Sequence, residues 1–559
     1  MLCFINTTVT YSYEIISNDI INHIEILAHD SLEGREVGET GEWKAAQYIK
    51  HIFETGNLLP KGDQNTYFQE FDFIKRIDFG ENNSLTVNGV KLKLNEEFQP
   101  LKQSASMEYE FNEIIDVDYG LVIPEEDGKY NDYEDLDVSG KAVIIKRFAP
   151  SSEDNPHIDF DKYNSITDKI KNATDNKAAA VILYTPEDED DTLRTIIFGD
   201  VYSKNIPIIF LRRKAFEKLQ IDLTKPVINS IAGRTELIKT RNTTQNVIGF
   251  IPGQTDTTII IGAHYDHLGW GGPTSLYHGD EKMIHNGADD NGSGVAVLLE
   301  LSRYYSSLRD DLKYSMLFIA FAGEEFGLLG SGNFAKNMTI DSSKVRMMIN
   351  MDMIGRLNEQ KNGLAILGTG TCNEFKNYFD SLVFDDFKLA LKESGTGPSD
   401  HTPFYNRKIP VLNFFTGAHT DYHKPSDDVD KIDTSGILKV TNLIVDIIDH
   451  FDDYNGTLIF QKTKDSGEGK RRSRFSVSLG IIPDYIAEIQ GLRVDGVSED
   501  KPGSKAGLME GDIIIKMGDN IIDDIYDYMN ALGKYRKGDS LDINIIRSND
   551  TLTLPVIFN

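Results

Sequence analysis

The adjacent carboxylates Glu324 and Glu325 are the residues of this sequence that most suggest chemistry. They follow the apolar run 316–322, at the point where a buried strand is expected to end. Acidic residues there can simply stabilise the start of a following helix. A carboxylate pair can also divide a reaction, with one residue holding a metal ion while the other moves a proton. The other potential ligands in the chain decide between these interpretations.

Four further segments place a potential metal ligand at the end of an apolar run or in the loop after it. The residues are His264 and Asp266 after 259–263, Asp289 and Asp290 before a glycine-rich turn and a helix, Asp352 after 346–351, and His423 after 409–417. A single histidine or aspartate is more often a hydrogen-bonded structural residue than a ligand. In an open α/β sheet, however, residues at the carboxyl ends of strands converge on one crevice. The five segments together therefore favour one shared site.

Two imidazoles, three carboxylates and no cysteine form a ligand set suited to Zn²⁺, with Mn²⁺ or Co²⁺ as replacements. Two ions a few ångströms apart need a bridging ligand. A carboxylate can bridge two ions and a neutral imidazole cannot, so the carboxylates are the candidate bridges.

The elements that must position these residues follow an α/β pattern. Strand-like runs alternate with helical patterns from 245 to 454, which predicts βαβ units and a largely parallel sheet with helices on both faces. Residues 18–54 have apolar residues at helical spacing on either side of a glycine-containing loop, which predicts two helices. Residues 67–94 alternate as strands do.

The motifs GAHYDHLG, NGADDNGSG, FAGEEFGLLGS, NMDMIGR, SDHTPF and YHKPSDD resemble, in this order, those of the co-catalytic dizinc aminopeptidase family. This family of bacterial leucyl aminopeptidases also contains glutamate carboxypeptidases and glutaminyl cyclases. The resemblance implies the zinc-exopeptidase (phosphorylase/hydrolase-like) fold, two Zn²⁺ per chain, and an exopeptidase that removes N-terminal residues from peptide substrates.

The resemblance also implies a role for each matching residue. His264 and Asp352 would bind one zinc, Glu325 and His423 the other, and Asp290 would bridge both. Glu324 would be the general base, which takes a proton from the metal-bound water and passes it to the departing amine. Asp266 would orient His264, because a metal-bound imidazole needs an acceptor for its other nitrogen.

Other polar residues in the same motifs are expected to have supporting roles. Tyr422 resembles a tyrosine that relatives use to hold the oxyanion, whereas the tyrosine that some relatives carry before the Ser-Asp-His motif is replaced here by Thr396. Asp400 and His401 are expected to support the ligands or the structure. Surface or hydrogen-bonding roles are expected for three more histidines, namely His267, His278 and His285.

Two flanking modules are expected beside the catalytic domain, which we place at 18–115 and 237–455. Residues 116–236, with KAVIIKR, AAAVILY and NIPIIFLRR, resemble a protease-associated domain, which would cover the cleft or only add stability. Residues 456–473 have the composition of a linker. Residues 474–559 resemble a β-rich PDZ domain, whose loop Leu479–Ile481 would bind the C-terminal carboxylate of a peptide ligand.

Composition excludes several classes of function. The net charge of -30 opposes binding to nucleic acid and to anionic membranes. No apolar run reaches the roughly 18 residues of a membrane span, and the first residues lack the pattern of a signal peptide. The resemblance to secreted bacterial relatives nevertheless predicts an extracytoplasmic (periplasmic or secreted) location.

Two alternative functions remain open at this stage. A carboxypeptidase of the same family would need arginines facing the metals, and Arg356 and Arg407 are the candidates near the motifs. A non-catalytic peptide-binding or scaffold protein would act through the PDZ and protease-associated modules. Glutaminyl cyclases of this family use a single zinc, so the complete two-metal ligand set argues against that reaction.

Overall fold

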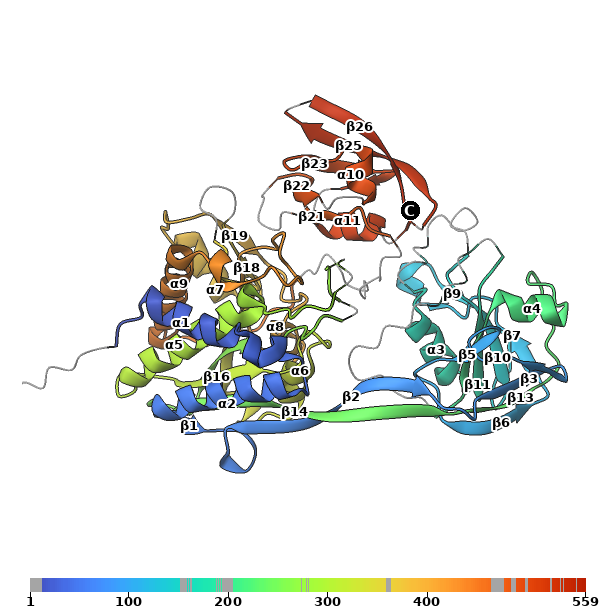
Figure 1. Ribbon diagram of the computed structural model, residues 1–559, viewed down its shortest axis with the longest axis horizontal. Helices are drawn as coiled ribbons and strands as arrows, with labels where there is room; N and C mark the ends of the chain where they lie inside the picture. The colour runs from blue at the N-terminus through green and yellow to red at the C-terminus, as the bar shows by residue number, and fades with distance from the viewer. Residues whose placement is uncertain are drawn as a thin grey trace, which may run out of the picture. The chain divides into compact units, whose positions relative to one another are not determined.

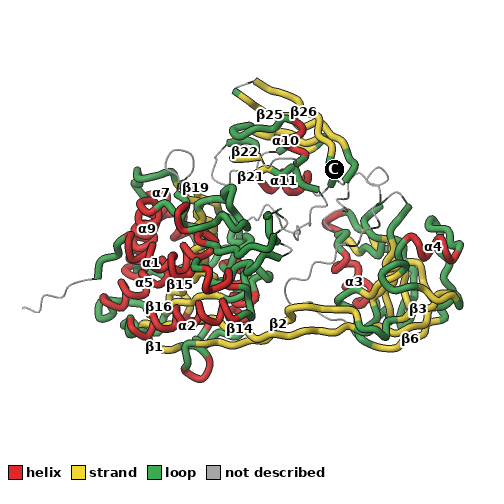
Figure 2. The backbone as a smooth tube through the Cα atoms, viewed as in Figure 1, coloured by secondary structure: helices red, strands yellow, loops and turns green. Residues whose placement is uncertain are grey.

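The structure is a computed structural model. It describes residues 13–150, 158, 160, 163–187, 189, 191, 193, 205–272, 274–277, 279, 281–357, 363–463, 477–483, 489–497, 501–522, 525–532, 534–535, 537–548 and 550–558. These residues form two compact units, one with the described residues up to 73 and from 243 onward, the other with 74–242. Each unit is described by itself, and Figures 1 and 2 label the elements.

A mixed sheet forms the centre of the first unit (Figure 1). Its strand order is β1 (Leu59–Pro60), β14 (Leu237–Ile251), β16 (Ser315–Phe321), β15 (Thr258–His264), β17 (Val345–Met351), β20 (Val411–Phe415), β18 (Leu364–Leu367) and β19 (Leu389–Lys392), and β2 (Phe68–Phe79) also pairs with β14. The four central strands β16, β15, β17 and β20 are mutually parallel. The predicted largely parallel sheet is confirmed.

Helices pack on both faces of this sheet. They are α1 (Ser17–Leu27), α2 (Thr40–Thr55), α5 (Gly294–Ser307), α6 (Leu329–Lys336), α7 (Asn373–Ser381), α8 (His401–Tyr405) and α9 (Thr434–Asp453), and η1 (Asp30–Arg35) lies between the first two. In β15, Ile259 and Ile261 pack into one core with α1, α2, α5 and α9, whereas Ile260 packs into the other with Phe334 and Phe404. Burial on both faces explains why the central strands are continuous apolar runs.

The second unit has a sheet of five strands, β5 (Phe98–Pro100), β12 (Ile208–Leu211), β11 (Ala180–Tyr184), β10 (Ala142–Lys146) and β7 (Ile114–Asp116), and a sheet of four, β4 (Val90–Leu92), β3 (Ser84–Val87), β13 (Ile231–Thr235) and β6 (Met107–Phe111). Its other elements are α3 (Ile166–Asp175), α4 (Arg213–Leu219) and the pair β8 (Val122–Ile123) and β9 (Tyr130–Asn131). The segments KAVIIKR, AAAVILY and NIPIIFLRR contain β10, β11 and β12.

A buried lysine makes this second unit sensitive to pH. Lys169 on α3 is 0% exposed, and its Nζ donates to the backbone oxygen of Tyr119. Burial lowers the pKa of Lys169 to about 7, against the opposing effect of the Asp132 and Asp118 carboxylates. Between about pH 7 and 10 the unfolded chain holds a proton that the folded chain has lost. The free energy of unfolding therefore rises with pH in this window, by up to about 1.4 kcal/mol per pH unit.

We expect Lys169→Met to remove this contribution. The stability of the variant relative to the unmodified protein should be greatest at or below pH 7 and should decrease steadily towards pH 10. Hydrogen exchange of β10 and β11, compared between the two proteins at each pH, measures the difference, because the intrinsic exchange chemistry then cancels. A difference that is constant from pH 6 to 10 would contradict the expectation.

Residues from 477 onward form an antiparallel sheet. It consists of β21 (Ile481–Pro483), β22 (Leu492–Val497), β23 (Ile513–Met517), β25 (Ser540–Arg547) and β26 (Asp550–Ile557), with β24 (Asn520–Ile521) beside β23, and with helices α10 (Pro502–Ala506) and α11 (Ile525–Leu532). β25 and β26 pair as an antiparallel hairpin. In the loop before β21, Leu479 is buried and Gly480 has φ +71, and a Cβ on Gly480 would lie 2.2 Å from the Lys501 side chain.

The first part of the predicted linker packs against the first unit. The Gln461 N–H donates to Thr371 O at 2.7 Å, and Thr463 hydrogen-bonds the Tyr405 hydroxyl at 3.0 Å. Residues 464–473 of the predicted linker lie outside the described residues. None of the helices in the described ranges combines the length and the apolar character needed to cross a bilayer. The extracytoplasmic location stays a prediction.

Candidate metal centre

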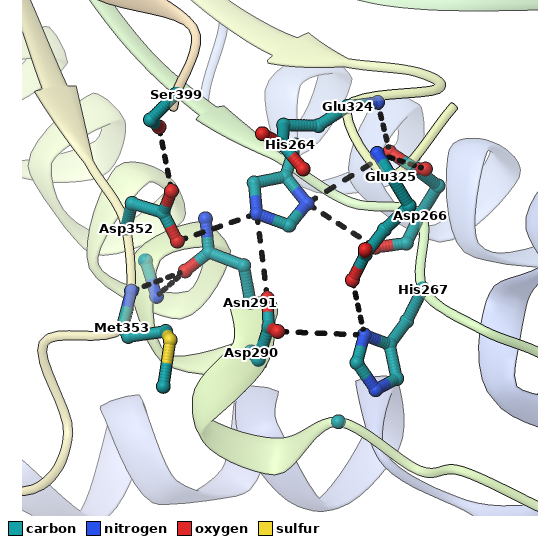
Figure 3. Close-up of polar contacts among 12 residues, drawn as sticks. His264, Asp266, His267, Asp290, Asn291, Glu324, Glu325, Asp352, Met353 and Ser399 are labelled. Atoms are coloured by element: carbon teal, nitrogen blue, oxygen red, sulfur yellow. Dashed lines mark hydrogen bonds and ion pairs between the residues drawn. The ribbon is translucent and has the colours of Figure 1, made fainter. Parts of the chain in front are cut away.

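The candidate ligands gather at one edge of the sheet in the first unit (Figure 3). His264 is the last residue of β15, Glu325 follows β16 and Asp352 follows β17. Asp290 lies in the turn η5 (Ala288–Ser293) that leads into α5. Because these strands are parallel, their carboxyl ends meet at the same edge. His423, in the loop after β20, reaches the same place.

The first ligand group consists of His264, Asp290 and Asp352. The Nε2 atom of His264 lies 3.5 Å from Asp290 Oδ1 and 3.4 Å from Asp352 Oδ1. One ligand atom from each residue falls within 4.8 Å of the others. This spacing suits three atoms around one small cation.

The second ligand group shares Asp290 and uses its other oxygen. Asp290 Oδ2 lies 3.4 Å from His423 Nε2 and 3.8 Å from His267 Nδ1. Glu325 stands between the two rings, with Oε2 at 3.2 Å from His423 Nε2 and Oε1 at 2.9 Å from His267 Nδ1. His267, Asp290 and Glu325 form a second set with ligand atoms within 4.8 Å. Asp290 therefore presents one oxygen to each group, as a bridging carboxylate does.

The charges at this edge fit a pair of cations. Burial alone would lower the pKa of His423, but the Glu325 and Asp290 carboxylates outweigh it and raise the pKa to about 11. Burial would likewise raise the pKa of Glu325, yet His423 and His267 hold it well below its usual range. A buried site that draws protons onto its imidazoles stabilises positive charge, and zinc supplies that charge when it displaces those protons. The nitrogen and oxygen donors also match zinc.

Glu324 belongs to neither ligand group, in contrast to its neighbour Glu325. Burial raises the pKa of Glu324 well above its usual range; His264 opposes this shift and the Glu325 carboxylate adds to it. A raised pKa suits a group that takes up and releases a proton. The two members of the pair therefore stand in different electrostatic environments.

Asp266 fixes the backbone of this carboxylate pair. Its Oδ1 accepts from the Glu324 N–H at 3.0 Å, and its Oδ2 from the Glu325 N–H at 3.4 Å (Figure 3). The Nδ1 of His264 lies 3.2 Å from the backbone oxygen of Asp266 and 3.8 Å from its carboxylate. The backbone oxygen of Asp266 thus accepts the hydrogen bond from His264, whereas its carboxylate accepts from the backbone N–H groups of the two glutamates. Sequence reasoning did not anticipate this second task.

Tyr422, Asp400 and His401 lie close to the ligands. The Tyr422 ring stacks on His423 with ring centroids 3.9 Å apart. Burial and nearby carboxylates raise the pKa of Tyr422 well above its usual range, so its hydroxyl remains a donor. Burial raises the pKa of Asp400 to about 6 and lowers that of His401 to about 4. The oxyanion-holding role of Tyr422 stays a prediction.

The expected surface position is wrong for two of the three remaining histidines. His267 is 0% exposed and lies in the second ligand group, and His285 is 1% exposed with Nε2 at 2.7 Å from Ser275 Oγ. The hydrogen-bonding alternative fits both residues. The loop after β15 packs on residues 34–35, where the His267 and Gly269 N–H groups donate to backbone oxygens, and the apolar periodicity gave no sign of this contact. His278 lies outside the described residues.

Asp427 and Arg356 support the loop that carries Asp289 and Asp290, and were not predicted to do so. The Asp427 carboxylate accepts from the Asp289 and Asp290 N–H groups, each at 3.0 Å. The Nη2 of Arg356 lies 3.2 Å from Asp421 and 3.3 Å from Asp427. Asp427 belongs to the motif YHKPSDD, but only the folded loops show which backbone it meets.

Arg35 joins the two loops that carry the ligands. It is 1% exposed and donates only to backbone oxygens, from Nε to Tyr265 at 2.8 Å, from Nη1 to Asn286 at 2.7 Å and to Leu27, and from Nη2 to Gly287 at 2.9 Å. Tyr265 adjoins His264, and Gly287 precedes the aspartate pair. The guanidinium therefore holds the loop that follows His264 against the loop that carries Asp290.

We expect Arg35→Met to destabilise the metal-free protein by at least about 3 kcal/mol, since several buried carbonyls lose their charged donor. Urea unfolding in the presence of a chelator measures the change. Arg407→Met, at an exposed position, is the matched control and should change stability by less than about 0.5 kcal/mol. Equal effects of the two substitutions would show that the hydrogen bonds of the Arg35 guanidinium contribute nothing to stability.

Several curated proteins are similar in sequence to part of this chain. It is 27% identical over 297 residues to Aminopeptidase YwaD of Bacillus subtilis (strain 168), covering 50% of this chain and 58% of that protein. It is 30% identical over 213 residues to a probable leucine aminopeptidase of Trichophyton verrucosum, covering 36% of this chain and 54% of that protein. The chain thus spans about half the length of the curated relatives it matches. A solved aminopeptidase from Aneurinibacillus sp. strain AM-1 is 22% identical, with a TM-score of 0.48 and coverage of 82% of this chain and 98% of that one.

Family comparisons assign three regions of the chain. Residues 246–448 match peptidase family M28, and this range contains every candidate ligand described above. Residues 117–219 match the PA domain and residues 460–557 match the PDZ domain. Residues 246–448 therefore belong to a domain of peptidase family M28, and the chain carries a PA domain and a PDZ domain in addition.

Proposed function

We propose that this protein is a dizinc aminopeptidase that hydrolyses N-terminal residues from peptides. The observation that carries the proposal is the position of Asp290, which presents one oxygen to each of two ligand groups, with Glu324 beside them. The names of the matched relatives, which include aminopeptidases from a bacterium and a fungus, support it.

The residues of the centre would hold two zinc ions. His264 and Asp352 would hold the first, Glu325 and His423 the second, and Asp290 would bridge them. When bound, zinc polarises the scissile carbonyl and increases the acidity of water. The chain therefore needs no nucleophilic serine or cysteine for hydrolysis.

Glu324 would move the proton. It takes a proton from the attacking water as the water bonds to the carbonyl carbon, and it gives this proton to the amine as the peptide bond breaks. Asp266 accepts from the Glu324 N–H and so fixes the backbone that carries the Glu324 side chain. The Tyr422 hydroxyl would donate to the oxyanion that develops in the transition state.

The charges of the site favour an aminopeptidase over a carboxypeptidase. A carboxypeptidase must bind the terminal carboxylate of its substrate with cationic side chains. Among the described residues, Arg356 is paired with Asp421 and Asp427, and Arg35 donates to four backbone oxygens. Neither is available to a substrate carboxylate. The carboxylate-rich centre suits the cationic amino terminus of a peptide instead.

A panel of aminoacyl p-nitroanilides and matched N-blocked peptides tests the proposal. Zinc-loaded protein should hydrolyse the free-amine substrates, and a chelator should abolish this activity. Hydrolysis confined to N-blocked peptides would instead assign a carboxypeptidase or an endopeptidase. If zinc binds but none of the substrates is turned over, the non-catalytic scaffold becomes the better description.

For the PDZ domain we propose a C-terminal peptide ligand at the loop Leu479–Ile481. Gly480 adopts a left-handed backbone there, and the Leu479 oxygen accepts from the Gly503 N–H at 2.8 Å, so the loop is held in place. Backbone N–H groups of such a loop bind a terminal carboxylate. In fluorescence polarisation a peptide library with free C-termini should bind, and the same peptides as C-terminal amides should not. Equal binding of both forms would refute this mode.

A further inference from the structure

The two oxygens of Glu325 have different partners. Oε2 lies 3.2 Å from Nε2 of His423, on the side of Asp290 Oδ2. Oε1 lies 2.9 Å from Nδ1 of His267 (Figure 3). The carboxylate is therefore held from two sides, and only one of its oxygens faces the histidine that the family pattern assigns to the second zinc.

The first ligand group repeats this arrangement with a different donor. Asp352 Oδ1 lies 3.4 Å from His264 Nε2, and Asp352 Oδ2 accepts from Ser399 Oγ at 2.5 Å (Figure 3). Asn350 in turn donates to Ser399 Oγ at 2.8 Å. In each group, one oxygen of the carboxylate faces a histidine ligand while a neighbouring side chain holds the other oxygen. Ser399 at the first group thus corresponds to His267 at the second.

The fold fixes the His267 ring. Its backbone N–H donates to Arg35 O at 3.1 Å, and its side chain is 0% exposed. Gly287 passes so close that a Cβ there would lie 2.5 Å from the ring. Nε2 has no hydrogen-bond partner among the described residues, so the polar contacts of the ring lie on the side of Glu325 and Asp290. The surroundings leave the ring one orientation.

The geometry distinguishes a hydrogen bond from direct coordination. Two ligand atoms on one tetrahedral zinc, each about 2.0–2.1 Å from the ion, stand about 3.3 Å apart. The 2.9 Å between Nδ1 and Oε1 is instead a normal hydrogen-bond distance. Glu325 must be ionised to bind a metal and can then only accept, so Nδ1 carries the hydrogen and has no lone pair for a metal.

We propose that His267 is a positioning residue for the second zinc, which donates from Nδ1 to Oε1 of Glu325 and leaves Oε2 to bind the ion. The proposal rests on the zinc sites of the proposed function but not on the reaction. Partners of this kind typically change metal affinity by about 10- to 100-fold. The N–H donor at Nδ1, and not the imidazole ring as such, is what we expect to affect zinc affinity.

A nearly isosteric pair of substitutions tests the donor. His267→Asn keeps an N–H close to the position of Nδ1, and His267→Leu has no donor. Zinc retained against a competing chelator is measured in each variant without substrate, and Co²⁺-loaded protein is examined by visible absorption. We expect His267→Leu to lower the affinity for one of the two zinc ions by about 10- to 100-fold. His267→Asn should retain most of the affinity, and the Co²⁺ spectrum should be nearly unchanged.

The same pair in a Glu325→Ala background shows whether His267 acts through Glu325. There, His267→Leu should not weaken the remaining zinc further. Equal weakening by the Asn and Leu variants, with a changed Co²⁺ spectrum, would make His267 a direct ligand and overturn the proposal. So would unchanged affinity in His267→Leu, or an equal loss in the Glu325→Ala background. Because substrate is absent, a failed peptidase assay would not affect this result.

Discussion

Replacing Glu324 with glutamine is expected to lower kcat by about 10²- to 10⁴-fold while the protein keeps both zinc ions. The substitution preserves the size of the side chain but removes its ability to accept and release a proton. Glu324 lies outside both ligand groups, and its backbone N–H is held by Asp266, which glutamine does not disturb. Initial rates with an aminoacyl p-nitroanilide and zinc content by elemental analysis together measure the effect.

Glu393→Gln is a suitable control for this substitution. Glu393 forms an exposed ion pair with Lys376, so its replacement is expected to leave kcat unchanged. If Glu324→Gln loses zinc, Glu324 is a ligand and the assignment of the pair is wrong. Activity that survives the substitution with zinc still bound would mean that another group moves the proton.

Asp290→Asn is expected to have the largest effect on metal binding. Asp290 is the one residue common to both ligand groups, and an amide can supply only one neutral oxygen where the carboxylate supplies two charged ones. We expect the zinc content to fall below one ion per chain and kcat/KM to fall by more than about 10²-fold. This loss exceeds the factor of about 10 to 100 typical of removing a residue that only supports a ligand. Zinc titration of the metal-free variant by calorimetry measures the loss.

The neighbouring aspartate provides a matched control. Asp289 Oδ1 accepts from the Gly355 N–H at 2.7 Å, and Oδ2 faces His419 at 3.2 Å, away from both ligand groups. Asp289→Asn keeps the bond to Gly355 and should therefore bind two zinc ions. If both variants lose zinc to the same extent, the loop as a whole, and not the bridging carboxylate, determines metal binding.

The sheet and the location of the centre could be predicted because they depend on patterns that lie along the chain. Continuous apolar runs such as 259–263 and 316–322 indicate strands buried on both faces, and polar residues at their carboxyl ends must meet. The order of motifs added the family. The boundaries of the modules and the individual roles of the ligands stay predictions, although the structure brings His264, Asp290, Glu325, Asp352 and His423 together.

The supporting residues could not be predicted for a physical reason. Ser399, Asp427 and Arg35 contact the centre through hydrogen bonds to backbone or to the far oxygen of a ligand. Such bonds depend on the path of a loop in the folded chain, and neither the periodicity nor the composition of the sequence predicts that path. His267 illustrates this limit, since its motif was recognised while its burial was not.

The hydrogen bonds of Arg35 also affect the order in which the chain can fold during synthesis. Its bond to Asn286 spans 251 positions of the chain, and residues 74–242 of the second unit are made between the two partners. Arg35 therefore leaves the ribosome well before the loops that it holds, and the face of α1 that packs against α5 and α9 stays uncovered until those helices are made. The complete ligand set exists only after His423 has been made. Under the proposed function, a fully coordinated zinc site would thus form late, in a chain whose second unit has already had time to fold.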